Sequence, residues 1–497
     1  MKKLFLLAAA LISALTLCQA EEVTLAPGRN VISTYLKNAL NQETPPTDLT
    51  IKLKAGTYEQ HANMDLFCNT TICPAEEGAN VTIYADSMIM DTVTHQYTGK
   101  AYSAGGFRVI ASNLTINLQH LNILGQGQNV EGAVRGIKIY GAEKDINSCK
   151  NCVVNVEYCN FRSMDRGIYV YSVVSECALT VDHCTFDSIN RGIHISSYFD
   201  YYDDAYTLSK QRTDRVISSL TVTNSAFSNM QRGVYSGNTP WMVGPTKIEN
   251  CTFYNYDNRG VYFGNDTDTE DETGKTIHIT DPKKSDITVN HCTFYVGQIG
   301  ASSSDRSLYM AGTAGGVVTN NIFMSPANNS KQSFYVQGKT TTVSNNLCYN
   351  LAAKLSSYEG NDDSGKPSNE NEISSNPKFT NPETGNFTLE NGSPAINAGT
   401  DGKDLGNPTT DYSTKPEFVI DLNYGPDDDD DEIIDDDDDD DGDGSDLQTL
   451  LDHARVISTS AVSVNGMTYP DTNNLPAGIY VIRTQTDKGT QTYKIVK

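Results

Sequence analysis

The stretch Val181-Asp-His-Cys184-Thr-Phe186, followed by Gly192-Ile193-His194, is a phrase that this chain repeats with small variations. The other copies begin at Val156, Val222, Ile248, Val289, Val318 and Val343. Counted on the fourth residue of each copy, the spacings are 25, 41, 26, 41, 29 and 25 residues. A unit of about 25 residues with three short strands and occasional inserts predicts a parallel β-helix.

The residues inside each copy fit this prediction. Apolar residues alternate along the expected strands, so Val181, Cys184, Phe186 and Ile193 should point inward and stack on their counterparts one rung away. Asn and His tolerate the left-handed backbone of a sharp corner. The residues before the fourth position are therefore expected to form a corner: Tyr158, His183, Asn224, Asn250, His291, Asn320 and Asn345. A glycine after an arginine, as in Arg191-Gly192, is expected to permit a second corner.

The two ends of the repeat region resemble those of known secreted β-helix proteins. Residues 51–58 resemble the first strand of pectate-lyase-like β-helices, and residues 33–41 should form an amphipathic helix that covers the open first rung. Residues 376–379 and 391–399 resemble the closing segment of bacterial members. We therefore expect an all-β fold: a right-handed parallel β-helix over residues 21–425, followed by a small C-terminal β-sandwich.

The N-terminus predicts export. Met1-Lys2-Lys3 and the apolar run of residues 4–17 are typical of a signal peptide over residues 1–20, with lipoprotein processing at Cys18 as the alternative. The net charge is −25, and residues 427–446 contribute 15 acids, which leaves 62 − 15 = 47 acids against 37 bases. This balance favours a soluble extracellular protein, expected to be a monomer, and argues against nucleic acid as a partner.

The C-terminal region divides into two parts. Residues 426–446 are rich in Asp and are expected to form an extended linker. The alternative is Ca²⁺ binding, because Asp439, Asp441 and Asp443 have the spacing that opens a calcium loop, although Leu450 replaces the usual closing Glu. Residues 447–497, with Leu-Pro-Ala-Gly-Ile-Tyr at 475–480 and Lys-Ile-Val-Lys at the end, resemble a type IX secretion sorting domain. That resemblance implies the type IX machinery as a partner and a secreted or outer-surface location; an ordinary accessory β-sandwich is the alternative.

Ten cysteines follow Cys18. Those at the inward repeat position are expected to be buried thiols: Cys159, Cys184, Cys251 and Cys292. Cys152 and Cys177 each lie seven residues before one of these, hence one above the other. An exported protein permits disulfides, so Cys152–Cys177 and Cys68–Cys73 are candidate bridges.

Two outward columns follow from the alternation of strand residues. One holds Lys138, Tyr169, His194, Tyr235, Tyr262, Tyr309 and Tyr335, and its tyrosines either stack on sugar rings or pack on one another. The other holds Arg135, Arg166, Arg191, Arg232, Arg259 and Arg306. Its charges are either compensated by local carboxylates such as Asp165, Asp187 and Asp257, or by corner carbonyls, or they form a cationic strip for an acidic polysaccharide. Inserts near residues 197–217, 236–246 and 264–286 should wall these columns with residues 198–204 and Trp241.

The resemblance to pectate-lyase-like and chondroitinase-B-like polysaccharide lyases implies β-elimination on a uronate chain. That reaction needs a base, a neutralised carboxylate and an acid for the leaving oxygen. We assign Lys138 as base, Arg166 or Arg191 to the carboxylate and His194 as acid or orienting group. Substrate contacts are assigned to Tyr169, Tyr235, Tyr262, Tyr309, Arg232, Arg259 and Trp241. The alternative is a non-catalytic surface protein that binds glycans; a glycoside hydrolase is weaker, because the outward column shows no recurring acidic pair.

Overall fold

The computed structural model describes two compact units separately, Met1–Leu422 and Asn423–Lys497. The described residues are 20–85, 105–128, 134–140, 149–171, 174–196, 215–236, 243–264, 268–270, 276–278, 286–297, 306–310, 315–327, 332–337, 341–356, 367–422, 456–463, 468–469, 479–486 and 489–496. The expected signal peptide up to residue 19, the Asp-rich linker with its calcium alternative, residues 198–204 and Trp241 lie outside them. Among the described residues, no helix has the length and apolarity needed to span a bilayer.

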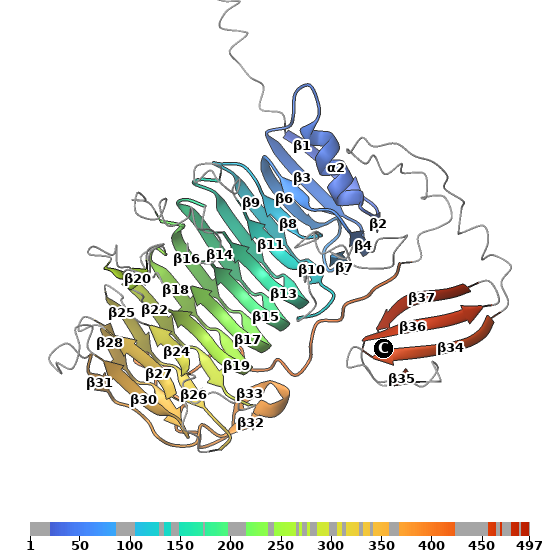
Figure 1. Ribbon diagram of the computed structural model, residues 1–497. Helices are drawn as coiled ribbons and strands as arrows, with labels where there is room; N and C mark the ends of the chain where they lie inside the picture. Colours follow the sequence, from blue (N-terminus) through green and yellow to red (C-terminus); the bar gives the residue numbers. More distant parts are fainter. Residues whose placement is uncertain are drawn as a thin grey trace, which may run out of the picture. The chain divides into compact units, whose positions relative to one another are not determined.

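The first unit is a parallel β-helix, as the repeat predicts (Figure 1). One face is a 12-stranded sheet in which each strand pairs in parallel with the strand one rung away. Its strands, in order, are β1 (Ala20–Leu25), β3 (Asp48–Leu53), β6 (Asn69–Pro74), β9 (Thr115–Gln119), β12 (Val153–Glu157), β14 (Cys177–Asp182), β16 (Ile217–Thr223), β18 (Thr246–Glu249), β22 (Asp286–Asn290), β25 (Gly315–Thr319), β28 (Thr341–Ser344) and β31 (Asn369–Glu370).

A 17-stranded sheet supplies the remaining faces. Its strands are β2 (Gly28–Arg29), β4 (Gly56–Gln60), β5 (Met64–Leu66), β7 (Val81–Ala85), β8 (Phe107–Val109), β10 (Asn122–Leu124), β11 (Arg135–Ile139), β13 (Asn160–Val170), β15 (Thr185–Ile195), β17 (Ala226–Ser236), β19 (Thr252–Phe263), β23 (Thr293–Tyr295), β24 (Arg306–Met310), β26 (Ile322–Met324), β27 (Gln332–Gln337), β29 (Leu347–Tyr349) and β30 (Ala352–Ser356). In β13, β15, β17 and β19 the second and third strands of a rung run on as one strand with a bend inside it.

The first corner lies where the sequence predicts it, and the second does not. Every expected first-corner residue, from Tyr158 to Asn345, has a φ between 48° and 60°. The second corner is formed by Ser163, Ser188, Asn229 and Asn255, each with a φ between 52° and 56°. The glycine prediction is wrong, because Gly192 and its counterparts do not have a positive φ. These glycines are required because a side chain would not fit: a Cβ on Gly192 would lie 2.7 Å from the Phe227 ring and 2.8 Å from the carbonyl oxygen of Gly233.

The core is a continuous stack of inward side chains. Its most regular part is a column of fully buried rings, namely Phe161, Phe186, Phe227, Phe253, Phe294 and Phe323. Neighbouring ring centroids lie 4.6–4.9 Å apart, with planes within 11° of parallel. This spacing equals the distance between strands, about 4.8 Å. The rung register therefore places every Phe on the next one.

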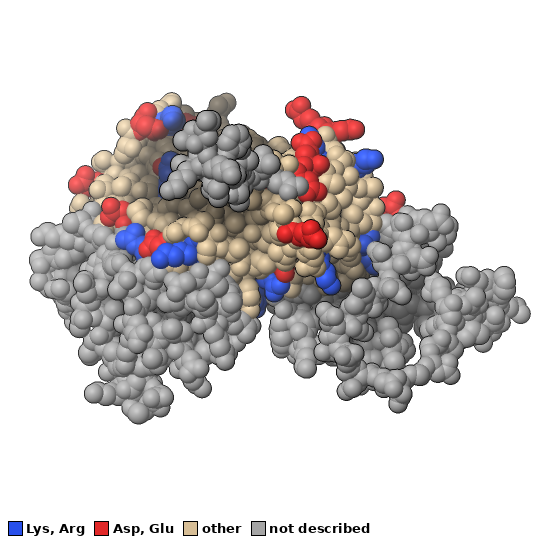
Figure 2. Space-filling model, turned by 90° about the horizontal axis from the view of Figure 1, so that it is seen from above, with Lys and Arg blue, Asp and Glu red and all other residues tan. Residues whose placement is uncertain are grey.

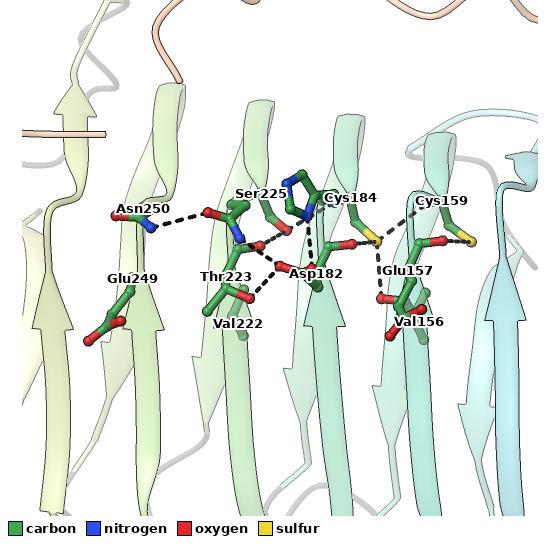
Figure 3. A network of polar contacts seen from close by, with 12 residues as sticks. Val156, Glu157, Cys159, Asp182, Cys184, Val222, Thr223, Ser225, Glu249 and Asn250 are labelled. Atoms are coloured by element: carbon green, nitrogen blue, oxygen red, sulfur yellow. Dashed lines mark hydrogen bonds and ion pairs between the residues drawn. The ribbon is translucent and has the colours of Figure 1, made fainter. Parts of the chain in front are cut away.

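Side chains at the first corner join successive rungs (Figure 3). Asp182 Oδ1 accepts from Thr223 Oγ1 at 2.5 Å and from Asn224 Nδ2 at 2.8 Å, and Asn250 Nδ2 donates to Asn224 Oδ1 at 3.1 Å. The inward cysteines bond to backbone instead: Cys184 Sγ donates to the carbonyl oxygens of Asp182 and Val156. These contacts pair polar groups that the corner would otherwise bury without partners.

The N-terminal end is covered by helix α2 (Val31–Leu40), which buries Ile32, Leu36 and Ala39. The expected helix is therefore present. The structure adds a strand that the sequence resemblance missed, because β1 lies outside β3 and forms the edge of the first sheet. Ser33 N donates to Gln60 Oε1 at 3.1 Å and ties the helix to the second sheet.

The segment expected to close the far end instead packs against the side of the last rungs. It contains β32 (Phe379–Asn381), the 3-10 helix η4 (Pro382–Thr384) and β33 (Asn386–Leu389). Phe379, Phe387 and Leu405 form a second small core with outward residues of the sheet such as Tyr254 and Tyr295. A short antiparallel pair, β20 (Asp268–Glu270) and β21 (Thr276–His278), lies within one insert.

Residues 407–421 then run back along the outside of the β-helix, from the late rungs to the early ones (Figure 1). We call this segment the return strap. Asn407 Nδ2 donates to Thr252 Oγ1 at 2.9 Å, and Thr57 Oγ1 donates to the Val419 carbonyl at 3.1 Å. Between them Lys415 Nζ lies 2.5 Å from Asp187 Oδ1. Asp187 was expected to compensate the arginine column, but it belongs to this strap contact and also pairs with Arg162 at 3.3 Å.

Replacing Lys415 by Met is expected to lower the free energy of unfolding by about 1–3 kcal/mol at pH 7, because Asp187 is then left buried with fewer partners. Burial raises the pKa of Asp187, but Lys415, Ser228 and Asn229 outweigh it and leave the pKa lowered. A lowered carboxyl pKa stabilises the fold above the unfolded pKa of about 3.9 and loses that effect as the pH falls.

Urea unfolding at pH 7 and pH 3 measures this effect. The loss in Lys415→Met should shrink at pH 3, because this pH lies below the unfolded pKa of about 3.9 and the unfolded chain then binds a proton at Asp187. Lys403→Met is the matched control, since the Lys403–Asp401 pair is exposed. An equal loss at both pH values would show that the charge of Asp187 is not what Lys415 stabilises.

The second unit contains a four-stranded antiparallel sheet in the order β35-β34-β36-β37. These strands are β34 (Val456–Ser463), β35 (Thr468–Tyr469), β36 (Ile479–Thr486) and β37 (Gly489–Val496). A small C-terminal β-structure is therefore present as predicted, as a single sheet among the described residues. Its role as a type IX sorting domain stays a prediction.

Candidate functional site

The two predicted columns lie side by side on the third strand of successive rungs, in β11, β24, β27 and the second halves of β13, β15, β17 and β19. Strand register aligns Lys138, Tyr169, His194, Tyr235, Tyr262, Tyr309 and Tyr335 in one row. It aligns Arg135, Arg166, Arg191, Arg232 and Arg259 in the other, and Arg306 continues that row by the same offset. We call the two rows together the Arg–Tyr ladder.

The tyrosines of the ladder pack on one another. The Tyr235–Tyr262, Tyr262–Tyr309 and Tyr309–Tyr335 ring centroids lie 5.1, 4.9 and 4.9 Å apart, with planes within 24° of parallel. Of the two sequence alternatives, mutual packing is the one observed. Because each ring face is covered by the next ring, a bound glycan would meet ring edges and hydroxyl groups rather than ring faces.

The arginines are compensated mainly by these rings. The Arg259 guanidinium carbon lies 4.3 Å from the Tyr262 centroid, and that of Arg232 lies 4.5 Å from the Tyr235 centroid. Such cation–π contacts offset repulsion without adding negative charge. Asp165, as expected, supplies a carboxylate, 3.1 Å from Arg166 and 3.8 Å from Arg135. Burial and then Arg135 lower the pKa of Arg166 in spite of this pair.

From Arg232 to Arg306, the described hydrogen-bond partners of the ladder arginines are neutral side chains. Arg232 Nε donates to Asn258 Oδ1 at 3.2 Å, and Arg306 Nε donates to Gln332 Oε1 at 2.7 Å. Within the described residues Arg259 has ring contacts and no carboxylate partner, and its Nε is buried without a hydrogen bond. Three successive rungs thus carry positive charges next to neutral amides and phenol rings.

The Lys138 end contains residues that sequence reasoning missed. Register continues the row from Lys138 to Arg108 and Asp65, whose side chains form a bidentate pair at 2.6 and 2.5 Å. Lys138 Nζ also donates to Asn63 Oδ1. Burial, followed by repulsion from Arg108 and Arg135, lowers the pKa of Lys138 to about 7. The early rungs carry only a distant form of the repeat, so no repeat position in the sequence points to Asp65 or Arg108.

His194 lies between two tyrosines. Its ring centroid is 4.9 Å from that of Tyr169 and 5.0 Å from that of Tyr235, and Arg191 Nη1 lies 3.1 Å from its Nδ1. Burial, followed by the positive charges of Arg166 and Arg191, holds the pKa of His194 well below its usual value. A neutral imidazole next to an arginine donor fits the orienting role better than that of a proton donor.

The expectation of an exposed column is wrong at this end of the ladder. Lys138, Tyr169 and His194 are only 2%, 1% and 1% exposed. The parity of strand residues places them outside the core, but it cannot show what else covers them. By contrast, Tyr235, Tyr262, Tyr309, Arg232 and Arg259 are half-buried and keep part of their surface in solvent.

Charge on the surface is otherwise mixed. On the described part of the face shown in Figure 2, Lys and Arg alternate with Asp and Glu in small groups around an uncharged surface. Among the described residues, the one group of three His, Cys, Asp or Glu side chains close enough to share a metal ion is Cys149, Cys152 and Cys177. This group is not part of the ladder.

Comparison with known proteins finds a family model and similar solved structures. Residues 287–405 match a family model described as a domain of unknown function, DUF5123. This match covers the last rungs and leaves the ladder from Arg135 to Tyr262 outside. No curated protein matches the chain. An alginate lyase from Paenibacillus sp. str. FPU-7, known from a crystal structure, is similar with a TM-score of 0.27 and 14% identity, over 70% of this chain and 95% of that one.

Proposed function

We propose that this protein binds an acidic polysaccharide along the Arg–Tyr ladder, outside the cell. The observation that carries the proposal is the row Arg232, Arg259 and Arg306, whose described partners are amides and phenol rings. Guanidinium groups match carboxylate and sulfate in charge and geometry. A row repeated at about the 4.8 Å strand spacing suits a ligand that is itself a repeating chain of negative charges.

The packing of the ladder prepares it for such a ligand. The stacked tyrosines hold each guanidinium in place, so little side-chain freedom is lost on binding. Partial burial weakens solvent screening and strengthens each contact with an anion. Arg259 has ring contacts and no carboxylate partner among the described residues, so its charge is the one that a ligand carboxylate or sulfate would neutralise.

Replacing Arg259 by Ala is expected to weaken binding of an acidic polysaccharide about 10- to 100-fold, since one charge-assisted contact is worth about 1.5–3 kcal/mol. Binding by the wild type should also weaken as salt rises. We would measure retention of polygalacturonate, alginate and chondroitin sulfate in affinity electrophoresis at low and high salt, with dextran as the neutral polymer.

Lys247→Ala is the matched control, because Lys247 lies on β18 of the other sheet and pairs with Glu249. It should bind as the wild type does. If none of the acidic polymers is retained, or if Arg259→Ala binds as tightly as the wild type, the ladder is not the binding surface.

A lyase is the second candidate, and the lowered pKa of Lys138 favours it. A neutral lysine at pH 7 could take the proton from the carbon beside a uronate carboxylate that Arg166 neutralises. The electron pair left on that carbon would form the new carbon–carbon double bond as the bond to the 4-linked oxygen breaks, and the departing oxygen would take a proton from water. Lys138 is buried, so the substrate would have to replace its hydrogen bond to Asn63. Elimination would add to binding at the same ladder rather than compete with it.

A further inference from the structure

Three cysteines converge at the turn that precedes β12 and β14. Cys149, Cys152 and Cys177 are fully buried, and their sulfur atoms all lie within 4.8 Å of one another. Cys149 Sγ and Cys152 Sγ are 3.7 Å apart. The turn between them contains Asn151 with a φ of 55°, and a backbone bridge from Lys150 to Ser175 fixes it on the next rung. The predicted stacking of Cys152 on Cys177 is therefore present, and Cys149 joins them.

The other inward cysteines show what a purely structural thiol does in this fold. Cys159, Cys184, Cys251 and Cys292 each donate to the carbonyl oxygen two residues earlier and to one on the preceding rung. Figure 3 shows this pattern at Cys184. Cys152 and Cys177 follow it too, since each donates to the carbonyl oxygen two residues earlier and to one on the preceding rung. Cys149 departs from it, because its sulfur is described against the sulfurs of Cys152 and Cys177. A repeat that needs only buried thiols does not explain Cys149.

We propose that Cys149, Cys152 and Cys177 bind one thiophilic metal ion of the Zn²⁺ or Cu⁺ class. Metal–sulfur bonds of about 2.3 Å place three sulfurs around one ion at about 4 Å from each other. The observed separations, 3.7 Å for one pair and no more than 4.8 Å for any, need little adjustment to reach this. Thiolate ligands select these soft ions over Ca²⁺ or Mg²⁺.

A disulfide accounts for the triad less well. It requires two sulfurs at about 2.05 Å, and it uses only two of the three thiols. The structure has all three as free thiols, and likewise Cys68 and Cys73, so neither bridge expected from the sequence is present. A metal ion uses all three sulfurs and releases one proton for each thiol that becomes a ligand. Such an ion would join the turns of two rungs; three thiolates complete a trigonal Cu⁺ site and would leave one position of a tetrahedral Zn²⁺ for water.

The test is metal binding by the full-length protein, purified with reductant and chelator. After addition of Zn²⁺, or of Cu⁺ without oxygen, and dialysis, elemental analysis should find one ion per chain for at least one metal. Cys149→Ser should bind none under the same conditions. Cys251→Ser should bind as the wild type does, because Ser225 shows that the repeat accepts serine at that position.

X-ray absorption of the loaded wild type gives a readout that does not depend on a variant folding, and three sulfurs at about 2.3 Å are expected. The proposal is overturned if the wild type retains neither metal, or if Cys149→Ser retains as much as the wild type. Thiol counting on protein unfolded without reductant is the third check: a disulfide between any two of the three cysteines would also overturn it.

Discussion

Replacing Phe227 by alanine is expected to lower the free energy of unfolding of the β-helix by about 3–5 kcal/mol. Phe227 is fully buried, between Phe186 at 4.6 Å and Phe253 at 4.8 Å. Its ring also contacts the glycine of the rung before it, Gly192, so the cavity has few neighbours that could move in to fill it. Because each rung of a solenoid is held mainly by its neighbours, a gap in the middle of the stack weakens the rungs on both sides.

Urea unfolding followed by circular dichroism measures this loss. Phe227→Leu should lose clearly less, because it keeps much of the apolar volume. Tyr158→Ala is the matched control: Tyr158 also stacks on rings one rung away, but it is 45% exposed at the corner. Its loss should stay within about 1 kcal/mol. Equal losses in Phe227→Ala and Tyr158→Ala would mean that the interior stack is not what holds the rungs together.

The features that recur in every rung could be predicted from the sequence. The Phe stack, the first corner and the two ladder rows each depend only on period and on the alternation of strand residues, which one chain displays many times. The second corner was misplaced for a physical reason. Ser163 and Asn229 adopt the left-handed backbone there, whereas the conspicuous Gly192 and Gly233 are needed to admit a Phe ring and a backbone carbonyl.

Features that depend on contacts between distant segments could not be predicted. Asp187 pairs with Lys415 of the return strap instead of with the arginine row. Lys415 is far from Asp187 in the sequence, so the local pattern around Asp187 could not predict this pair. Asp65 and Arg108 join the row at Lys138 through rung register alone. Strand parity distinguishes core from outside, but burial of an outside residue such as His194 depends on what packs over it.

If the protein is a lyase, replacing Lys138 by alanine is expected to reduce uronate elimination by about 10²–10⁴-fold, the usual contribution of a general base. Burial and the charges of Arg108 and Arg135 lower the pKa of Lys138 to about 7, and only neutral lysine accepts a proton. Wild-type activity should therefore rise as the pH rises through about 7. Ultraviolet absorbance of the new carbon–carbon double bond measures the rate, and Lys247→Ala is the control.

The pH dependence of protein stability distinguishes whether Lys138 is a catalytic base or only a buried lysine. A lysine whose pKa is lowered by folding destabilises the fold fully below the folded pKa of about 7, and this cost disappears as the pH rises toward the unfolded pKa of about 10.4. Lys138→Met should therefore remove the rise in stability between pH 7 and pH 10, whatever the activity. If Lys138→Met does so while Lys138→Ala keeps full elimination activity, Lys138 is a neutral buried lysine and not the base. If the wild type shows no elimination but is retained by an acidic polysaccharide, the proposed lyase activity is contradicted, whereas the proposed binding at the Arg–Tyr ladder is supported.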